Sequence, residues 1–207
     1  MKRHLSACLA ACFLAGCANT ARYAGGSQVY DFGLPARGLA DTARWAPIAL
    51  EVKGPAWIDS PAITYRLLYD DRLKLRGYVD SRWAAAPPLL LAQRWRQLVG
   101  LGGSSGQSAA NCLLRFELEE FSHVFDTPQS SRGVLHGRFA LLDARRRTIA
   151  EGALSEERPA VSADARGGVG ALLAAADESG RQLAEWLNDL EKQGAAGDCR
   201  ATAARSR

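Results

Sequence analysis

The chain has 207 residues, and its 26 Lys and Arg residues only slightly outnumber its 22 Asp and Glu residues. Two of the basic residues, Lys2 and Arg3, lie in an N-terminal segment that we expect to be removed, so 24 basic and 22 acidic residues remain. This balance excludes a general nucleic-acid-binding charge, and the remaining 191 residues suffice for one domain but not comfortably for two.

Residues 1–16 are expected to form a lipoprotein signal peptide. The basic start is followed by a short apolar run over 5–13 that contains no acidic residue and is too short to span a membrane as a mature helix. Residues 14–17 read Leu-Ala-Gly-Cys and match a bacterial lipobox. The thiolate of Cys17 would take a diacylglyceryl group, and the amine freed by cleavage would take a further acyl chain such as palmitate. The alternative, an ordinary secreted protein that loses Cys17 or uses it in a disulfide, stays open.

This lipid would be the only membrane anchor, because no other apolar run approaches the roughly 18 residues of a transmembrane helix. Two or more acyl chains hold a protein stably on a bilayer. Ala18 follows the cysteine in place of the aspartate that usually retains a lipoprotein at the inner membrane, which favours the outer membrane, facing the periplasm. Residues 17–28 are then the lipidated cysteine and a flexible tether.

The first half of the remaining chain predicts strands followed by a helix. Apolar residues alternate with polar ones from Tyr30 to Leu34 and again over 48–52, which indicates two short strands. Two further alternating runs, over 63–69 and 73–79, are joined by a tight polar turn and predict a β-hairpin. A helix is expected over 87–99, with prolines in its first turn.

The second half repeats this order. A strand with one apolar and one mostly charged face is predicted over 112–119, and a second hairpin runs from about 133 to 156 with its turn at 143–146. A long amphipathic helix ends near Lys192. We therefore expect a single α/β domain over 29–192, a mostly antiparallel or mixed sheet of six to seven strands with two main amphipathic helices packed on it, and a disordered tail over 193–207.

Two cysteines, Cys112 and Cys199, remain after Cys8 and Cys12 leave with the signal and Cys17 is lipidated. An even pair in an oxidising compartment is compatible with a disulfide. The alternatives are a simply buried Cys112 and an unpaired Cys199 in the tail, since the sequence does not give the separation of the two Cα atoms.

Motifs that could carry catalysis or bind cofactors fail on their context. The pattern G-x-S-x-G at 102–106 includes Ser104 and Ser105, but a nucleophile elbow needs a strand before the serine and a helix after it, whereas a helix precedes this segment. The glycines at 167–170 lack the lysine of a P-loop, and close packing of a helix start explains them better. His123 and His136 lie in no ligand-spaced cluster, so we expect no metal and no cofactor.

The basic run Arg145-Arg146-Arg147 is expected at a solvated hairpin tip, with contact to anionic lipid headgroups or an acidic partner as the alternative. Trp83 and Trp95 are expected in the core between helix and sheet, the alternative being a ligand platform. The residues by themselves therefore indicate a lipid-anchored periplasmic binding domain and no enzyme.

Short segments in a fixed order carry a resemblance to a known family. They are YDFGLP at 30–35, PAITYR at 61–66, SRWAAAPP at 81–88, LEEF at 118–121, and PA at 159–160 followed by WL at 186–187. In this order behind a lipobox they resemble the PqiC-type ABC transport auxiliary lipoproteins, over about residues 29–190.

The resemblance implies an outer-membrane accessory protein with no catalytic residues. It would work with an inner-membrane ABC transporter and a periplasmic MCE-domain (mammalian cell entry) protein that together move lipids between membranes and support membrane integrity. Homo-oligomerisation is left open. Two alternatives remain: a periplasmic lipoprotein that carries a lipid or assists outer-membrane assembly, which would need a groove lined by the apolar face of the sheet, and a small serine hydrolase using Ser104 or Ser105.

Overall fold

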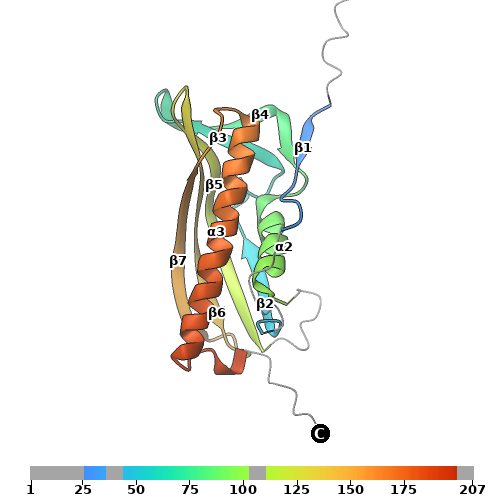
Figure 1. The fold of residues 1–207 in the computed structure, drawn as a ribbon, viewed down its shortest axis with the longest axis vertical. Helices are drawn as coiled ribbons and strands as arrows, with labels where there is room; N and C mark the ends of the chain where they lie inside the picture. Colours follow the sequence, from blue (N-terminus) through green and yellow to red (C-terminus); the bar gives the residue numbers. More distant parts are fainter. Residues whose placement is uncertain (1–25, 36–43, 103–110, 200–207) are drawn as a thin grey trace, which may run out of the picture.

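One mixed sheet of seven strands carries two helices on one of its faces (Figure 1). The computed structural model describes residues 26–35, 44–102 and 111–199. The strands are β1 (Gln28–Tyr30), β2 (Ile48–Lys53), β3 (Ala62–Leu67), β4 (Asp71–Trp83), β5 (Cys112–Thr127), β6 (Ser130–Leu142) and β7 (Thr148–Pro159). The helices are α2 (Pro87–Val99) and α3 (Ala165–Lys192), followed by one 3₁₀ turn, η3 (Gly197–Cys199). This confirms the expected single α/β domain, and none of the described helices is long and apolar enough to cross a bilayer.

Strand β5 is the centre of the sheet. Along one side it pairs antiparallel with β6, which in turn pairs antiparallel with β7. Along its other side it pairs parallel with two shorter strands, β2 beside its first half and β3 beside its second half. The predicted hairpins are both present, as β3 with β4 and β6 with β7. Strand β1 pairs parallel with the end of β4 and so lies at the edge of the sheet, next to β4.

The domain is elongated, and its two ends carry different elements (Figure 1). We call the upper end the one that holds β1, the turn between β3 and β4 and the start of α3. The lower end holds the start of β2, the turn between β6 and β7 and the end of α3. Helix α3 has 28 residues and therefore extends over about 42 Å.

A β-bulge in β5 reverses which residues face the helices. The pairing with β6 shifts between Leu118 and Glu120. Before the shift the even-numbered residues are in the core, up to Leu118, and after it the odd-numbered residues are, beginning with Phe121. The charged face predicted for 112–119 is present, and the extra residue of the bulge lets the same strand continue with its apolar side still against the helices.

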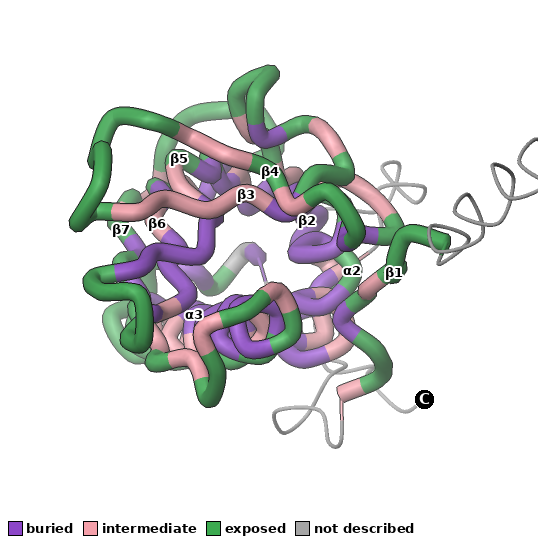
Figure 2. Tube along the Cα trace, turned by 90° about the horizontal axis from the view of Figure 1, so that it is seen from above, coloured by how far each residue is buried: buried purple, intermediate pink, exposed green. Residues whose placement is uncertain are grey.

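The core lies between the sheet and the two helices (Figure 2). Trp83 and Trp95 are both buried, at 1% and 0% exposure, as expected from the sequence. The indole Nε1 of Trp95 donates a hydrogen bond of 2.8 Å to the carbonyl of Ala176, which ties α2 to α3. Helix α2 ends at Gly100, whose left-handed φ of 79° favours glycine.

The start of α3 packs directly on His123, which is fully buried on β5. A Cβ atom on Gly168 would lie 2.3 Å from Nδ1 of His123, so only glycine allows this approach. Gly167 and Gly168 therefore serve close packing, in agreement with the sequence-based interpretation, whereas a Cβ atom on Gly170 would meet nothing within 4 Å. The same nitrogen shares a 2.8 Å hydrogen bond with the hydroxyl of Tyr78. Burial lowers the pKa of His123 to about 4, although the nearby Asp164 acts to raise it, and burial raises the pKa of Tyr78 above its usual range.

The C-terminal segment departs from expectation. The disordered tail predicted from residue 193 is wrong for 193–199, which follow α3 as turns and η3, with Ala196 fully buried. The structure joins Cys112 and Cys199 in a disulfide, with their Cα atoms 5.3 Å apart. This covalent bond and the buried Ala196 hold a segment whose small, polar composition gave no sign of packing.

We predict that His123 makes folding stability depend on pH. The unfolded chain takes up a proton near the ordinary histidine value of 6.5, whereas the folded chain does so only near 4. Stability contributed by the neutral ring is therefore complete above pH 6.5 and is lost as the pH falls towards 4, by about 3 kcal/mol. Urea unfolding of the wild type and of His123→Gln at several pH values measures this. The prediction would be contradicted if the free energy of unfolding depended on pH equally in both proteins between pH 6.5 and 4.

We predict that replacing both Cys112 and Cys199 by alanine lowers the free energy of unfolding by about 4 kcal/mol. The disulfide closes a loop of 87 residues, and its removal restores the conformational entropy of the unfolded chain. The measurement is urea unfolding of both proteins with and without a reducing agent. The reductant should destabilise the wild type and leave the variant unchanged, and a loss below about 1 kcal/mol would argue against the constraint.

Candidate functional site

Helix α2 holds the N-terminal segment through the buried side chain of Arg94. Its guanidinium forms a bidentate ion pair with Asp177 of α3, with N···O distances of 2.6 and 2.7 Å. Its remaining nitrogen donates to the carbonyls of Phe32 and Gly33, at 3.0 and 3.4 Å. One side chain thus joins both helices to the segment that leads out of the domain, and we call this contact the Arg94 clamp.

The segment 31–33 is shaped for this contact. The carboxylate of Asp31 accepts a 2.9 Å hydrogen bond from the backbone N–H of Gly33, whose φ of 57° is left-handed and favours glycine. Phe32 enters the core, where its ring meets Trp83 edge-on at 5.4 Å and Phe121 at 6.0 Å. The sequence Asp-Phe-Gly, part of the family resemblance, therefore places one aromatic anchor.

Two expectations about this region are corrected. The first strand was predicted over Tyr30 to Leu34, but β1 covers Gln28 to Tyr30 and the chain then leaves the sheet. The proposed tether reached residue 28, but Gln28 pairs with Ser81 of β4. The physical reason is the Arg94 clamp, which draws Phe32 away from the sheet plane and into the core.

A hollow lies in the lower half of the domain, between α2, β2 and the turn that joins β6 to β7. We call it the lower hollow; its volume is about 530 Å³. It is lined by Ala49, Leu50, Glu51, Val52, Pro88, Leu89, Ala92, Arg96, Leu113, Arg115 and Arg146. Three arginines and one glutamate therefore surround a mostly apolar lining. Leu89 is 64% exposed and lies open to solvent on α2.

Ion pairs fix most of the charged groups of the lower hollow. Glu51 and Arg115 are direct neighbours in the parallel pairing of β2 with β5, and Arg115 Nε lies 2.9 Å from the carboxylate. Lys53 pairs with the same carboxylate at 3.0 Å. Partial burial acts to raise the pKa of Glu51, but hydrogen bonds from Arg115 and Lys53 lower it overall. Arg96 donates a 3.1 Å hydrogen bond to the carbonyl of Leu50.

Arg146 is held at the edge of the lower hollow in an unfavourable backbone conformation. Its φ is 65°, and it is the one non-glycine residue with positive φ in the part of the chain that the structure describes. Asp143 organises the turn, since its carboxylate accepts hydrogen bonds from the backbone N–H groups of Arg147 and Arg145, which lower its pKa. Within the described ranges, Arg146 forms no ion pair. Strained residues of this kind concentrate at functional sites.

A second hollow, of about 640 Å³, lies on the face of the sheet opposite the helices. Strands β5, β6 and β7 line it with Arg115, Glu117, Arg138 and Glu151 among others. Arg115 lines both hollows. Arg138 pairs with Glu119 at 2.6 Å beside this hollow. This surface combines ion-paired side chains with apolar patches. Such a surface is suited to the docking of another molecule.

The other candidate residues predicted from the sequence lie in different parts of the chain. Cys17, Ser104 and Ser105 lie outside the described residues. Of the two histidines, His123 is buried in the core and His136 is half-buried on β6. The run Arg145-Arg146-Arg147 forms an exposed turn, as expected, but Arg146 also lines the lower hollow.

The sequence analysis missed both the Arg94 clamp and the contribution of Arg96 to the lower hollow. Arg94 and Arg96 occur in a predicted amphipathic helix, where an arginine is ordinarily solvated. A usable signal was the position of Arg94 on the same helical face as Leu90, Leu91 and Leu98, all of which are buried. The partner, Asp177, is 83 residues away, and no local pattern connects the two.

Comparison with known proteins establishes the fold and leaves the family open. No family model and no curated protein matches this sequence. The crystal structure of a Xanthomonas campestris protein of the DUF330 family is similar with a TM-score of 0.67 and 16% identity, over 81% of this chain and 98% of that chain. A second crystal structure, of an uncharacterized protein, has a TM-score of 0.61 and 14% identity, over 78% of this chain and 99% of that chain. This chain shares their fold.

We predict that Arg94→Met loosens the N-terminal segment. The substitution keeps most of the apolar stem but leaves the carbonyl of Phe32 and the carboxylate of Asp177 without their partner, at a cost of about 2 to 3 kcal/mol. Limited proteolysis should cut near residues 30–34 faster than in the wild type, and thermal unfolding should shift downward. Arg181→Met, on the exposed face of α3, serves as the control and should change neither. Unchanged protease resistance in Arg94→Met would mean that Phe32 alone holds the segment.

Proposed function

We propose that this chain is an outer-membrane lipoprotein that serves as a non-enzymatic docking component of a lipid-transport system, in which an inner-membrane ABC transporter works with a periplasmic MCE-domain protein. The lipobox at Cys17 supports the lipid anchor. The similarity in fold to a DUF330 protein supports the family assignment, because DUF330 is the PqiC-type family. The similarity concerns the fold, and the role in transport is our proposal.

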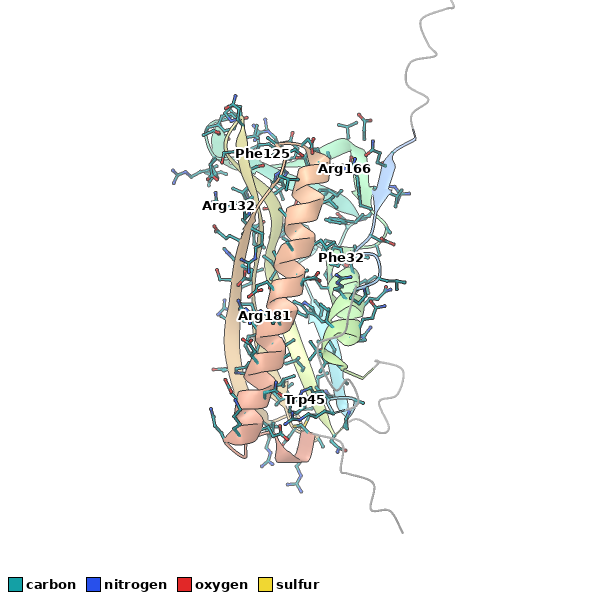
Figure 3. All side chains as sticks on the ribbon, in the orientation of Figure 1. Phe32, Trp45, Phe125, Arg132, Arg166 and Arg181 are labelled. Atoms are coloured by element: carbon teal, nitrogen blue, oxygen red, sulfur yellow. A yellow bond between two sulfur atoms is a disulfide. The ribbon has the colours of Figure 1, made fainter. Side chains whose placement is uncertain are left out.

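The observation that carries the proposal is the position of the lower hollow relative to the start of the domain. Strand β1 lies at the upper end (Figure 1), and its pairing with β4 and the Arg94 clamp fix this segment to the body. Phe32, which follows β1, lies beside α2 (Figure 3). The lower hollow lies in the opposite half, towards the far end of a helix about 42 Å long. A domain anchored through its upper end would thus present the lower hollow to the periplasm, where a partner would dock.

The chemistry of the lower hollow favours a partner segment that combines a carboxylate with apolar side chains. Arg146 forms no ion pair with any described residue, and the exposed Leu89 provides apolar contact on α2. An exposed arginine at the rim of an interface attracts an acidic partner and speeds its association. We infer that Arg146 receives an acidic side chain of the partner.

The lipid-carrier alternative has less support. It requires a groove along the apolar face of the sheet, but α2 and α3 fill this face, where Leu114, Leu135 and Leu141 are fully buried. The hydrolase alternative rests on Ser104 and Ser105, which lie outside the described residues, and it remains a separate hypothesis that their replacement by alanine would test.

We predict that Arg146→Gly reduces recovery of the partner about tenfold without weakening the fold. Glycine accepts the positive φ at no steric cost, so the variant loses the guanidinium but keeps the turn and should be at least as stable as the wild type. The measurement is purification of the lipidated protein from membranes in mild detergent, with mass identification and quantification of the co-purifying MCE-domain protein.

The matched control is Arg145→Ala, which removes the neighbouring exposed charge outside the lower hollow. It should leave partner recovery close to that of the wild type. Equal recovery with Arg146→Gly would exclude the lower hollow as the docking site, and the absence of any MCE-domain protein from all preparations would overturn the proposed function.

A further inference from the structure

Exposed apolar side chains concentrate at the upper end of the domain. Nine large apolar side chains are exposed among the described residues, and six of them lie at this end. They are Val29, Leu68, Tyr69, Leu73, Val79 and Val161. Figure 2 looks onto this end and shows exposed stretches along the β3–β4 hairpin. Such a one-sided distribution in a folded domain marks a surface that meets another apolar phase or a partner.

The clearest part of this surface lies on β4. Leu73 is 85% and Val79 91% exposed. The pairing of β4 with β3 is irregular at both positions, because its register shifts between Asp71 and Arg76 and again between Gly77 and Arg82. The hydroxyl of Tyr78 meets His123 in the core, whereas Leu73 and Val79 belong to no core cluster of the described residues. We call the exposed surface around Leu73 and Val79 the Leu73–Val79 face.

We propose that the Leu73–Val79 face rests on the surface of the bilayer that holds the lipid of Cys17. This inference depends on the lipid anchor of the proposed function. Gly26 follows Cys17 by nine positions, and an extended chain advances at most about 3.6 Å per residue, which gives a reach of about 30 Å. Gln28 is paired to Ser81, two residues from Val79. The tether therefore keeps this face within reach of the membrane.

The charges of β4 suit a bilayer with anionic headgroups. The strand carries four basic side chains and two acidic ones. Arg72, Lys74 and Arg82 form no ion pair with any residue that the structure describes. Basic side chains near an anionic bilayer surface are attracted to it, and their long stems, like the ring of Tyr69, are compatible with the boundary between headgroups and acyl chains. The occupant that fits is therefore a phospholipid surface containing phosphatidylglycerol or another anionic lipid.

A fluorescent probe at position 73 tests this contact. With Cys17 lipidated and Cys112 bonded to Cys199, Leu73→Cys introduces a single free thiol at an exposed position that the fold does not use. The lipidated protein, labelled there with an environment-sensitive fluorophore, is placed on vesicles of phosphatidylethanolamine and phosphatidylglycerol with and without nitroxide-labelled acyl chains. Ala144→Cys, at the exposed turn of the lower end, is the matched control.

We expect the nitroxide lipids to quench the probe at position 73 at least about twofold more than the probe at position 144. Equal quenching at both positions on protein that floats with the vesicles would overturn the inference while leaving the lipid anchor intact. A blue shift at position 73 without quenching would show that a second protein copy covers the face, which also contradicts it. Failure of both labelled proteins to float with vesicles would instead contradict the lipid anchor itself, and with it the proposed function.

Discussion

Strand β5 pairs with three other strands, β6, β2 and β3, and the packing of the rest of the domain depends on these pairings. Over its 16 residues it pairs with β6 on one side and with β2 and then β3 on the other. In a regular strand of this length the side chains would alternate between the two faces throughout. The twist of the sheet would then turn the apolar side away from the helices. The bulge after Leu118 resets the alternation. His123 therefore packs against the start of α3 and Phe121 against Phe32 and Trp83, while Phe116 packs against Trp95 of α2. One core can therefore extend along the whole of α3.

Much of this fold follows from local patterns, whereas the contacts that orient the candidate surface do not. Period-two alternation and turn residues identified both hairpins, and amphipathic spacing identified both helices. The predicted strand over 112–119 ended at the bulge in β5, because a shift of one residue looks like the end of an alternating run. Pairing between Arg94 and Asp177 joins residues remote in sequence, and the left-handed φ of Arg146 is imposed by Asp143 and has no signature of its own.

The same distinction explains the candidate site. The sequence predicted two parts of the candidate site, namely the charged face of 112–119 and the arginine run at 145–147. Its location was not predicted, since the lower hollow is assembled from α2, β2 and a hairpin turn that are distant along the chain. The apolar alternation on β4 predicted a strand correctly, but the sequence could not say that Leu73 and Val79 would be exposed, because a buried and an exposed apolar pattern have the same letters.

The bond between Cys112 and Cys199 also bears on how such a domain would be secreted. It links the first residue of β5 to a residue beyond the end of α3. The second cysteine is therefore synthesised only after nearly the whole domain. In a reducing cytosol the two thiols would stay apart. A newly made chain would therefore lack its final cross-link until it had passed through the translocon and met an oxidase. The bond would form last and would add its stabilisation only on the far side of the membrane.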